Sequence, residues 1–378
     1  MHLFTLSQYT SAGETDDARI ARCLRDSAAE SPRTIVFDVP CCTVSRAILL
    51  PPDTTVILDG CRIVQADTTV DNVFRGDNVI PDPANPLGMP LACGKTRNIR
   101  IIGRTGARIS GSAHHAQAVS PAISKTQETA GELEGWRTFA VCLSNCDGFE
   151  VSGIAFDRPL SFDRCINGRI TDITLDMHGK NGVGIDLRSG CRRCVIRRIR
   201  VTSADAAVAC TALAGSTAQD SPDGRLRYPM EPSTCVPAQT RAELDICDIT
   251  IEDICTNGCR HGAICRAANG CRVFDIRIDG VTESAPDGGH ARESLVKICT
   301  GGGEACADGD LHDISVRNVV ASYAESAFYA NTRLVRCTLR NIHQLTRFRR
   351  SNQITASTEQ RRQARRSPKK SAGAAAFP

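Results

Sequence analysis

One short phrase recurs along this chain: an apolar residue, two residues of mixed character and a second apolar residue, preceded by a short alternating stretch. The recurring pairs are Val151/Ile154, Ile170/Ile173, Ile196/Ile199, Ile251/Ile254, Ile278/Val281, Val316/Val319 and Leu339/Ile342. Their first members lie 19, 26, 55, 27, 38 and 23 residues apart. The four shorter intervals suit one coil of a solenoid, and the two longer ones suit a coil that carries a loop insertion.

The segments around these pairs are short, rich in Val and Ile, and bounded by Gly, Asn or Asp, which is typical of strands rather than helices. Strands repeated at coil length, without helices between them, predict an all-β fold in which each coil buries its apolar face on the next. We expect a single-stranded, right-handed parallel β-helix over residues 1–346. Residues 15–30 predict an N-terminal capping helix, with Thr15 or Asp16 as its N-cap.

Three segments depart from the repeat. Residues 76–96, with four prolines, and residues 213–243 predict loop excursions that border a substrate site. Residues 347–378 carry nine Arg or Lys against one acid, Glu359, and predict a disordered basic tail. Because this tail holds the whole positive excess of the +4 net charge, the remainder is net acidic. We therefore expect no nucleic-acid partner beyond weak, salt-dependent contacts of the tail.

Composition narrows the class of protein further. The chain is 41% hydrophobic and 23% charged, as in globular proteins. No run approaches the roughly 18 apolar residues of a membrane helix, so we expect no membrane partner. The N-terminus lacks a basic region followed by an apolar one, which predicts a cytoplasmic protein. The 20 cysteines are scattered and are interpreted as reduced thiols, with Cys146, Cys191 and Cys271 at comparable positions of a stacked interior.

Several segments resemble a known group of proteins. The opening SQYTSAGETDDARIARCL (7–24), followed by TIVFDVP and AILLPPDTTVILDG, is similar to the N-terminal pattern of the pectin-lyase-like superfamily. The central stretch NGVGIDLRSGCRRCVIRRIRVTSADAAVACTAL (181–213) resembles the catalytic region of the polygalacturonases, glycoside hydrolase family 28. The resemblance covers about residues 1–345. It implies a right-handed β-helix that hydrolyses O-glycosidic bonds in oligosaccharides or polysaccharides, including uronate-containing ones, by general acid catalysis.

The four motifs of that family match this chain in part. Its Asn-Thr-Asp, paired-aspartate, Gly-His-Gly and Arg-Ile-Lys motifs fall on Asn181-Gly182-Val183, Ala204-Asp205-Ala206, Arg260-His261-Gly262 and Leu295-Val296-Lys297. The resemblance implies Asp205 as the general acid, with His261 supporting it. It also implies that Lys297 and Asn181 bind the substrate. Val183 and Ala206 stand where the family has carboxylates.

Those two replacements matter because inverting hydrolysis needs two carboxylates, about 6.5–9.5 Å apart. Val183 and Asp205 are 22 residues apart, so we expect them on adjacent coils. Asp186, three residues after Val183, is the candidate replacement base. In a regular strand its odd offset would direct it to the opposite face, which leaves a structural or solvent-facing role open.

Two arginines and one cysteine pair complete the candidates. Arg188 and Arg266 occupy comparable positions in their coils and are candidate ligands of a uronate, although solvated arginines at a sheet edge would look the same. Cys191-x-x-Cys194 has no second cysteine pair of matching spacing, so we expect no metal and no other cofactor.

Three functions remain open from the sequence. The interpretation adopted is a glycosidase acting on an oligosaccharide or polysaccharide substrate. The first alternative is a catalytically eroded β-helix that binds glycans or a protein partner, which the replacements at Val183 and Ala206 favour. The second is a polysaccharide lyase on the same fold, which would need a Lys or Arg base and usually a cation.

Overall fold

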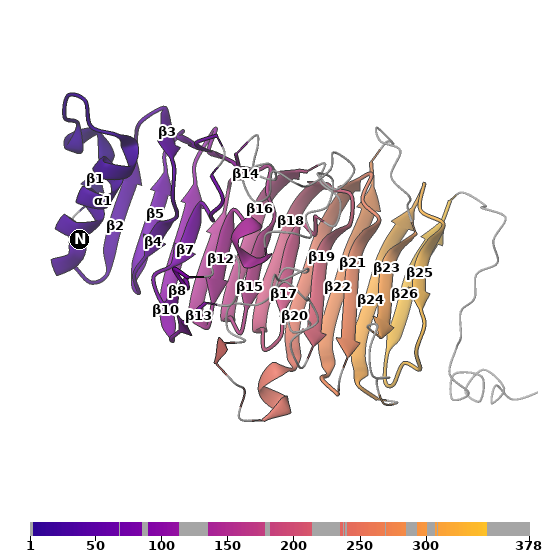
Figure 1. The fold of residues 1–378 in the computed structure, drawn as a ribbon. Coiled ribbons are helices and arrows are strands. Elements are labelled where there is room, and N and C mark those ends of the chain that lie inside the picture. Colours follow the sequence, from indigo (N-terminus) through magenta and orange to yellow (C-terminus); the bar gives the residue numbers. More distant parts are fainter. Residues whose placement is uncertain are drawn as a thin grey trace, which may run out of the picture.

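The computed structural model describes residues 3–67, 69–84, 90–112, 135–177, 182–213, 235–236, 238, 240–268, 270–284, 293–300, 307 and 309–345. Two long parallel sheets run side by side along the molecule, and the chain advances steadily from the N-terminal end to the C-terminal end (Figure 1). Neighbours in each sheet come from successive coils. The structure confirms the predicted all-β parallel β-helix.

The first sheet holds most of the long strands. In spatial order they are β1 (Leu3–Thr5), β2 (Arg33–Phe37), β5 (Thr54–Leu58), β10 (Thr96–Gly103), β13 (Cys146–Ser152), β16 (Ile166–Asp176), β18 (Arg192–Thr202), β20 (Ile246–Asn257), β22 (Val273–Glu283), β24 (Leu311–Ala321) and β26 (Thr338–Gln344). Four short strands join it to the side: β3 (Cys41–Val44), β6 (Arg62–Gln65), β11 (Arg108–Ser110) and β14 (Ala155–Phe156).

The second sheet is built from the strands that alternate with these along the chain. They are β4 (Ile48–Leu50), β7 (Phe74–Gly76), β12 (Val141–Ser144), β15 (Leu160–Asp163), β17 (Ile185–Arg188), β19 (Ala206–Leu213), β21 (His261–Ala268), β23 (Ser294–Thr300) and β25 (Ser326–Ala330). One interior core of buried residues fills the space enclosed by the coils.

The apolar pairs of the sequence stack in register. Ile170, Ile196, Ile251, Ile278, Val316 and Leu339 form one row, and their partners three residues later form a second. Between the two members of each pair lies a residue with positive φ: Asp172, Arg198, Asp253, Gly280, Asn318 and Asn341. This left-handed bend turns the strand, so that side chains three apart both enter the core. Asp, Asn and Gly adopt this conformation more readily than most residues.

Part of the cysteine excess is also explained by stacking. Three buried thiols lie level with one another at the starts of β13, β16 and β18. They belong to Cys146, Cys165 and Cys191, which directly precede the register partners Asp147, Ile166 and Arg192. Cys271 does not belong to this row. The residue level with Cys191 is Ile246 in β20 and Val273 in β22, two positions after Cys271. The cysteines in the described part of the chain are free thiols.

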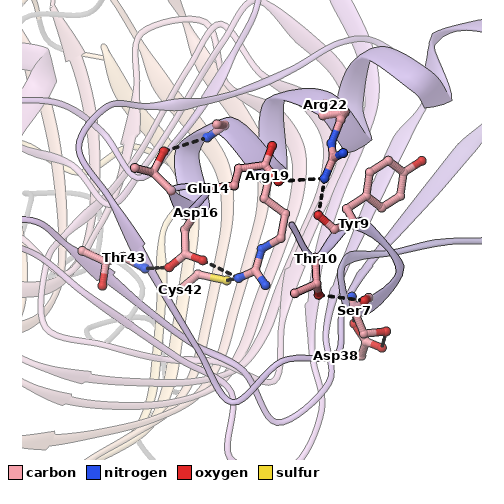
Figure 2. A network of polar contacts seen from close by, with 12 residues as sticks. Ser7, Tyr9, Thr10, Glu14, Asp16, Arg19, Arg22, Asp38, Cys42 and Thr43 are labelled. Carbon is pink, nitrogen blue, oxygen red and sulfur yellow. Dashed lines mark hydrogen bonds and ion pairs between the residues drawn. The ribbon is translucent and has the colours of Figure 1, made fainter. Parts of the chain in front are cut away.

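Helix α1 (Asp16–Asp26) lies at the N-terminal end of the coil (Figure 1). The Thr15 hydroxyl caps it by accepting a hydrogen bond from Ala18 N at 3.3 Å. Ile20 and Cys23 enter the core. Asp16 accepts a hydrogen bond from Thr43 N of β3 at 2.6 Å, so an acid of the first helical turn fastens the cap to the first coils (Figure 2).

Short elements and excursions complete the described chain. The 3-10 turns are η1 (Leu6–Tyr9), η2 (Ser27–Ala29), η3 (Gly135–Thr138) and η6 (Arg241–Leu244), and β8 (Val79–Ile80) pairs antiparallel with β9 (Ala92–Cys93) within the predicted excursion 76–96. Val79 and Cys93 pack on Cys142 outside the second sheet, and Cys235 of the predicted excursion 213–243 joins them. Most of that second excursion and the basic tail 347–378 lie outside the described residues. Among the helices that are described, none has the length and apolar character to cross a membrane.

Candidate functional site

Three charged residues from consecutive coils meet at one edge of the second sheet. Asp205, Arg260 and Glu293 each stand directly before a strand, namely β19, β21 and β23. Arg260 N donates to Asp205 O at 2.9 Å, and Glu293 N donates to Arg260 O at 3.2 Å. Neighbouring parallel strands lie about 4.8 Å apart. The fold therefore stacks a carboxyl, a guanidinium and a second carboxyl, one coil apart each.

His261 lies directly behind this stack and is held in one tautomer. Its side chain is buried, and Nδ1 donates to the carbonyl oxygen of Ser294 at 2.8 Å. Because a carbonyl can only accept, the proton sits on Nδ1 and Nε2 carries a lone pair. Lys297 Nζ lies 3.5 Å from Nε2. Burial lowers the pKa of His261 to about 4, so the ring is neutral near pH 7.

Glu293 connects the cations of the site. Its Oε2 accepts from Lys297 Nζ at 2.9 Å, and its Oε1 accepts from Arg260 Nε at 2.7 Å. Partial burial acts to raise the pKa of this carboxyl, but the hydrogen bonds from Lys297 and Arg260 outweigh it and bring the pKa to about 2. Glu293 is therefore ionised at every ordinary pH.

Asp205 has the opposite electrostatic balance. Burial raises its pKa, and the negative charge of Glu293 adds to that effect. The cations Arg260, Arg266 and Lys297 act in the other direction without cancelling the rise. The Ser203 hydroxyl accepts from Asp205 N at 3.0 Å and donates to Gly182 O at 2.7 Å, which fixes the turn before β19. The cluster thus holds one carboxyl whose pKa is raised and one whose pKa is lowered.

An apolar patch lies beside the charged cluster, outside the second sheet and separate from the interior core. Its members are Val183, Ala206, Ala209, Ile264 and Cys299. Val183 and Ala206 are the two positions where the family resemblance implies carboxylates. In this chain both side chains pack on aliphatic neighbours, so the sites of the missing acids are filled with hydrocarbon.

The orientation of Asp186 corrects the expectation drawn from a regular strand. Gly184 faces the core, since a Cβ there would meet Leu175 and Val201, and the following Ile185 is buried in the core as well. Two successive inward positions bring Val183 and Asp186 to the same outer face. Asp186 forms an ion pair with Arg188 and lies level with Ala209 of the next coil. It therefore sits deeper along the strands than Asp205, which precedes β19.

The remaining predicted residues are Arg188, Arg266, Lys297 and Asn181. Arg266 contributes to the field at Asp205, and the register puts Arg188, Thr211 and Arg266 in one row. Lys297 lies on the outer face level with Ile264 and with the half-exposed ring of Tyr329. Asn181 lies outside the described residues. Within the described ranges, no three His, Cys, Asp or Glu side chains are placed to share a metal ion.

Arg260 and Glu293 are the members of the cluster that sequence reasoning missed. Arg260 stands at the first position of the His261 motif, where the family has a glycine, and Glu293 falls outside the four motifs. A signal was available, because each residue directly precedes a strand of the second sheet, as Asp205 does, and parallel strands begin at the same edge.

Comparison with known proteins places the fold. No protein-family model matches this chain, and no curated protein matches it by sequence. The solved endo-xylogalacturonan hydrolase from Aspergillus tubingensis is similar with a TM-score of 0.55 and 12% identity, over 90% of this chain and 87% of that one. A mutant tailspike protein of E. coli bacteriophage HK620 is similar with a TM-score of 0.51 and 10% identity, over 89% and 55%. At these identities the likeness is one of fold alone, and it supports the parallel β-helix described above.

Proposed function

We propose that this protein hydrolyses O-glycosidic bonds in oligosaccharides, with Asp205 as the general acid. The observation that carries the proposal is the position of the partly buried Asp205 carboxyl, one coil from Arg260 and two coils from the Glu293 carboxylate. Burial raises the pKa of Asp205 in this cluster. A general acid must hold its proton near the working pH and give it to the leaving oxygen. Among the described residues of this cluster, Asp205 alone combines a carboxyl group with that shift.

Hydrolysis by a single displacement also needs an ionised carboxylate that accepts a proton from water. Glu293 has the required charge. It stands two coils from Asp205, which separates the two Cα atoms by about 9.6 Å at about 4.8 Å per coil. Asp186 fits this role less well, since it lies level with Ala209 of the next coil and not with the turn that holds Asp205. We therefore assign the base to Glu293 in place of the carboxylate that Val183 replaces.

The reaction then balances as follows. Asp205 donates its proton to the glycosidic oxygen while the bond from that oxygen to the anomeric carbon breaks. A water molecule attacks the anomeric carbon from the opposite side, and Glu293 takes up its proton. The products are a reducing sugar and an alcohol. Lys297 and Arg266 contact hydroxyl or carboxylate groups of the sugar by charge-assisted hydrogen bonds.

A second candidate function is glycan binding without catalysis. The apolar patch of Val183, Ala206, Ala209, Ile264 and Cys299 supports it, because hydrocarbon occupies the positions of two expected acids. Such a surface suits the apolar face of a sugar ring, while Arg266 and Lys297 beside it suit its polar groups.

One assay separates these functions. The protein is incubated with oligogalacturonides and with neutral galactose oligomers, and reducing ends and ultraviolet absorbance are followed. New reducing ends without absorbance, abolished in Asp205→Asn, support hydrolysis. Absorbance from an unsaturated product would indicate a lyase instead. Measurable binding with neither product would support the glycan-binding alternative.

A further inference from the structure

Glu293 forms ion pairs with two cations of the candidate site. Its carboxylate contacts Arg260 on the preceding coil at 2.7 Å and Lys297, on the strand that Glu293 precedes, at 2.9 Å. The side chains of Glu293 and Arg260 are 34% and 45% exposed, so solvent and ligands reach this pair. Glu293 thus holds two cations at an accessible edge of the sheet.

The cluster carries an excess of positive charge. Arg260, Arg266 and Lys297 all act on Asp205, and among the described neighbours of this carboxyl Glu293 opposes them with a negative charge. Asp205 has a raised pKa and retains its proton to a higher pH than an ordinary carboxyl. Such a cluster attracts anions, and a carboxylate of the chain already occupies its cations.

We propose that Glu293 is an internal ligand of Arg260 and Lys297, which an anionic group of the bound ligand replaces. The class of ligand, a carboxylate-bearing saccharide, rests on the proposed function. Replacement has a second consequence for that function: both Glu293 oxygens are engaged in the absence of ligand, and the exchange frees them to accept a proton from water. Anionic saccharides would thereby be preferred over neutral ones.

The exchange is physically inexpensive. Partly exposed ion pairs are weak because solvent screens them. Lys297 does not lose its position when Glu293 leaves, since Nζ also lies 3.5 Å from Nε2 of the buried His261. His261 is itself fixed by the carbonyl of Ser294. The incoming anion therefore finds a cation that is already placed.

The test compares binding of digalacturonate with binding of neutral digalactose by calorimetry at pH 7. Glu293→Gln removes the internal carboxylate, and we expect it to bind digalacturonate about two- to five-fold more tightly than the natural protein, with digalactose unchanged. Glu293→Gln combined with Lys297→Met should lose this gain. The matched control is Glu252→Gln, because Glu252 also lies near two arginines, Arg197 and Arg277, but on the first sheet.

Several results would overturn the proposal: equal or weaker digalacturonate binding by Glu293→Gln, an equal gain for digalactose, or no measurable digalacturonate binding by either protein. If Glu293→Gln does not fold, Glu293→Asp carries the test, since its shorter side chain withdraws from both cations. It should show a smaller gain, and no gain would count against the proposal. Hydrolysis is scored separately: a gain in affinity without hydrolysis removes the proposed function alone, and hydrolysis without the gain removes this inference alone.

Discussion

The Glu293 carboxylate lies 3.6 Å from Nε2 of His261, yet the two do not form an ion pair near pH 7. Burial of the imidazole outweighs the nearby negative charge and holds the pKa of the ring at about 4. Glu293 instead pairs with Arg260 and Lys297. The neutral ring of His261 contacts Lys297 through Nε2. Burial therefore decides the charge pattern of this site more than proximity does.

The neutral state of His261 predicts a pH dependence of stability. Its pKa is lower in the folded protein, about 4, than the ordinary value of 6.5. Between these values the unfolded chain binds a proton that the folded one does not, so the free energy of unfolding falls as pH drops from 6.5 to 4, by about 3 kcal/mol. His261→Asn should remove this component in urea unfolding series, whereas exposed His343→Asn should keep it. An unchanged pH dependence in His261→Asn would contradict the assignment.

Asp205→Asn should lower hydrolysis by about 100-fold or more, because the amide cannot donate a proton as a carboxylic acid does. In the natural protein the rate should fall as pH rises through the pKa of Asp205, since the acid must be protonated. Because burial raises the pKa of Asp205, this fall in rate should occur at a pH above the ordinary carboxyl pKa of 3.8. The measurement is kcat/KM against pH on oligogalacturonides. A variant with the natural rate would exclude Asp205 from the mechanism.

Glu293→Gln should lower the pKa of Asp205. The Glu293 charge raises that pKa, while Arg260, Arg266 and Lys297 would continue to lower it after the substitution. Carboxyl carbon NMR titration of Asp205 measures the shift directly and does not depend on activity. Glu252→Gln, on the other sheet, should leave the titration unchanged. A rise in the pKa of Asp205 would show that Glu293 acts on it through structure rather than through charge.

The fold could be predicted because its cause is local. Ile170/Ile173 and Ile278/Val281 repeat at coil length, and a left-handed residue between the members of each pair forces both side chains inward. The same bend explains why a three-residue spacing, unusual for a strand, marks this architecture. A property of single coils was enough to predict how the coils stack.

The site could be predicted only in part. His261 and Lys297 fell on motif positions and do lie together. The expectation that Asp186 would point to the opposite face from Val183 was wrong. Gly184 and Ile185 both face the core, which breaks the alternation of a regular strand. Glu293 was missed because its importance comes from Arg260, a residue 33 positions away that the coil brings beside it. Such relations depend on register, which no single segment contains.

The apolar patch predicts unequal costs for restoring the missing acids. Ala206 is 1% exposed and packs in the patch with Ala209 and Ile264, so Ala206→Asp would bury a charge among hydrocarbon. We expect it to lower the free energy of unfolding by about 3 kcal/mol. Val183 is only partly buried, and Val183→Asp should cost about 1 kcal/mol. Urea unfolding of both variants gives the comparison, and equal costs would mean that the patch does not exclude water.

The left-handed bend predicts a substitution that separates backbone strain from side-chain contacts. Asn318 has φ 56° and its amide donates to Asp279 Oδ1 at 2.7 Å, while Asn341 donates to its oxygen at 3.0 Å. Asn318→Gly loses both hydrogen bonds but keeps the conformation freely. Asn318→Val loses the same hydrogen bonds and also forces a β-branched side chain into the left-handed region, which adds about 1–2 kcal/mol. Thermal unfolding should therefore rank natural protein, Asn318→Gly and Asn318→Val in decreasing stability. Equal stability of the two variants would show that the bend does not depend on its φ, and the account of the three-residue spacing would fail with it.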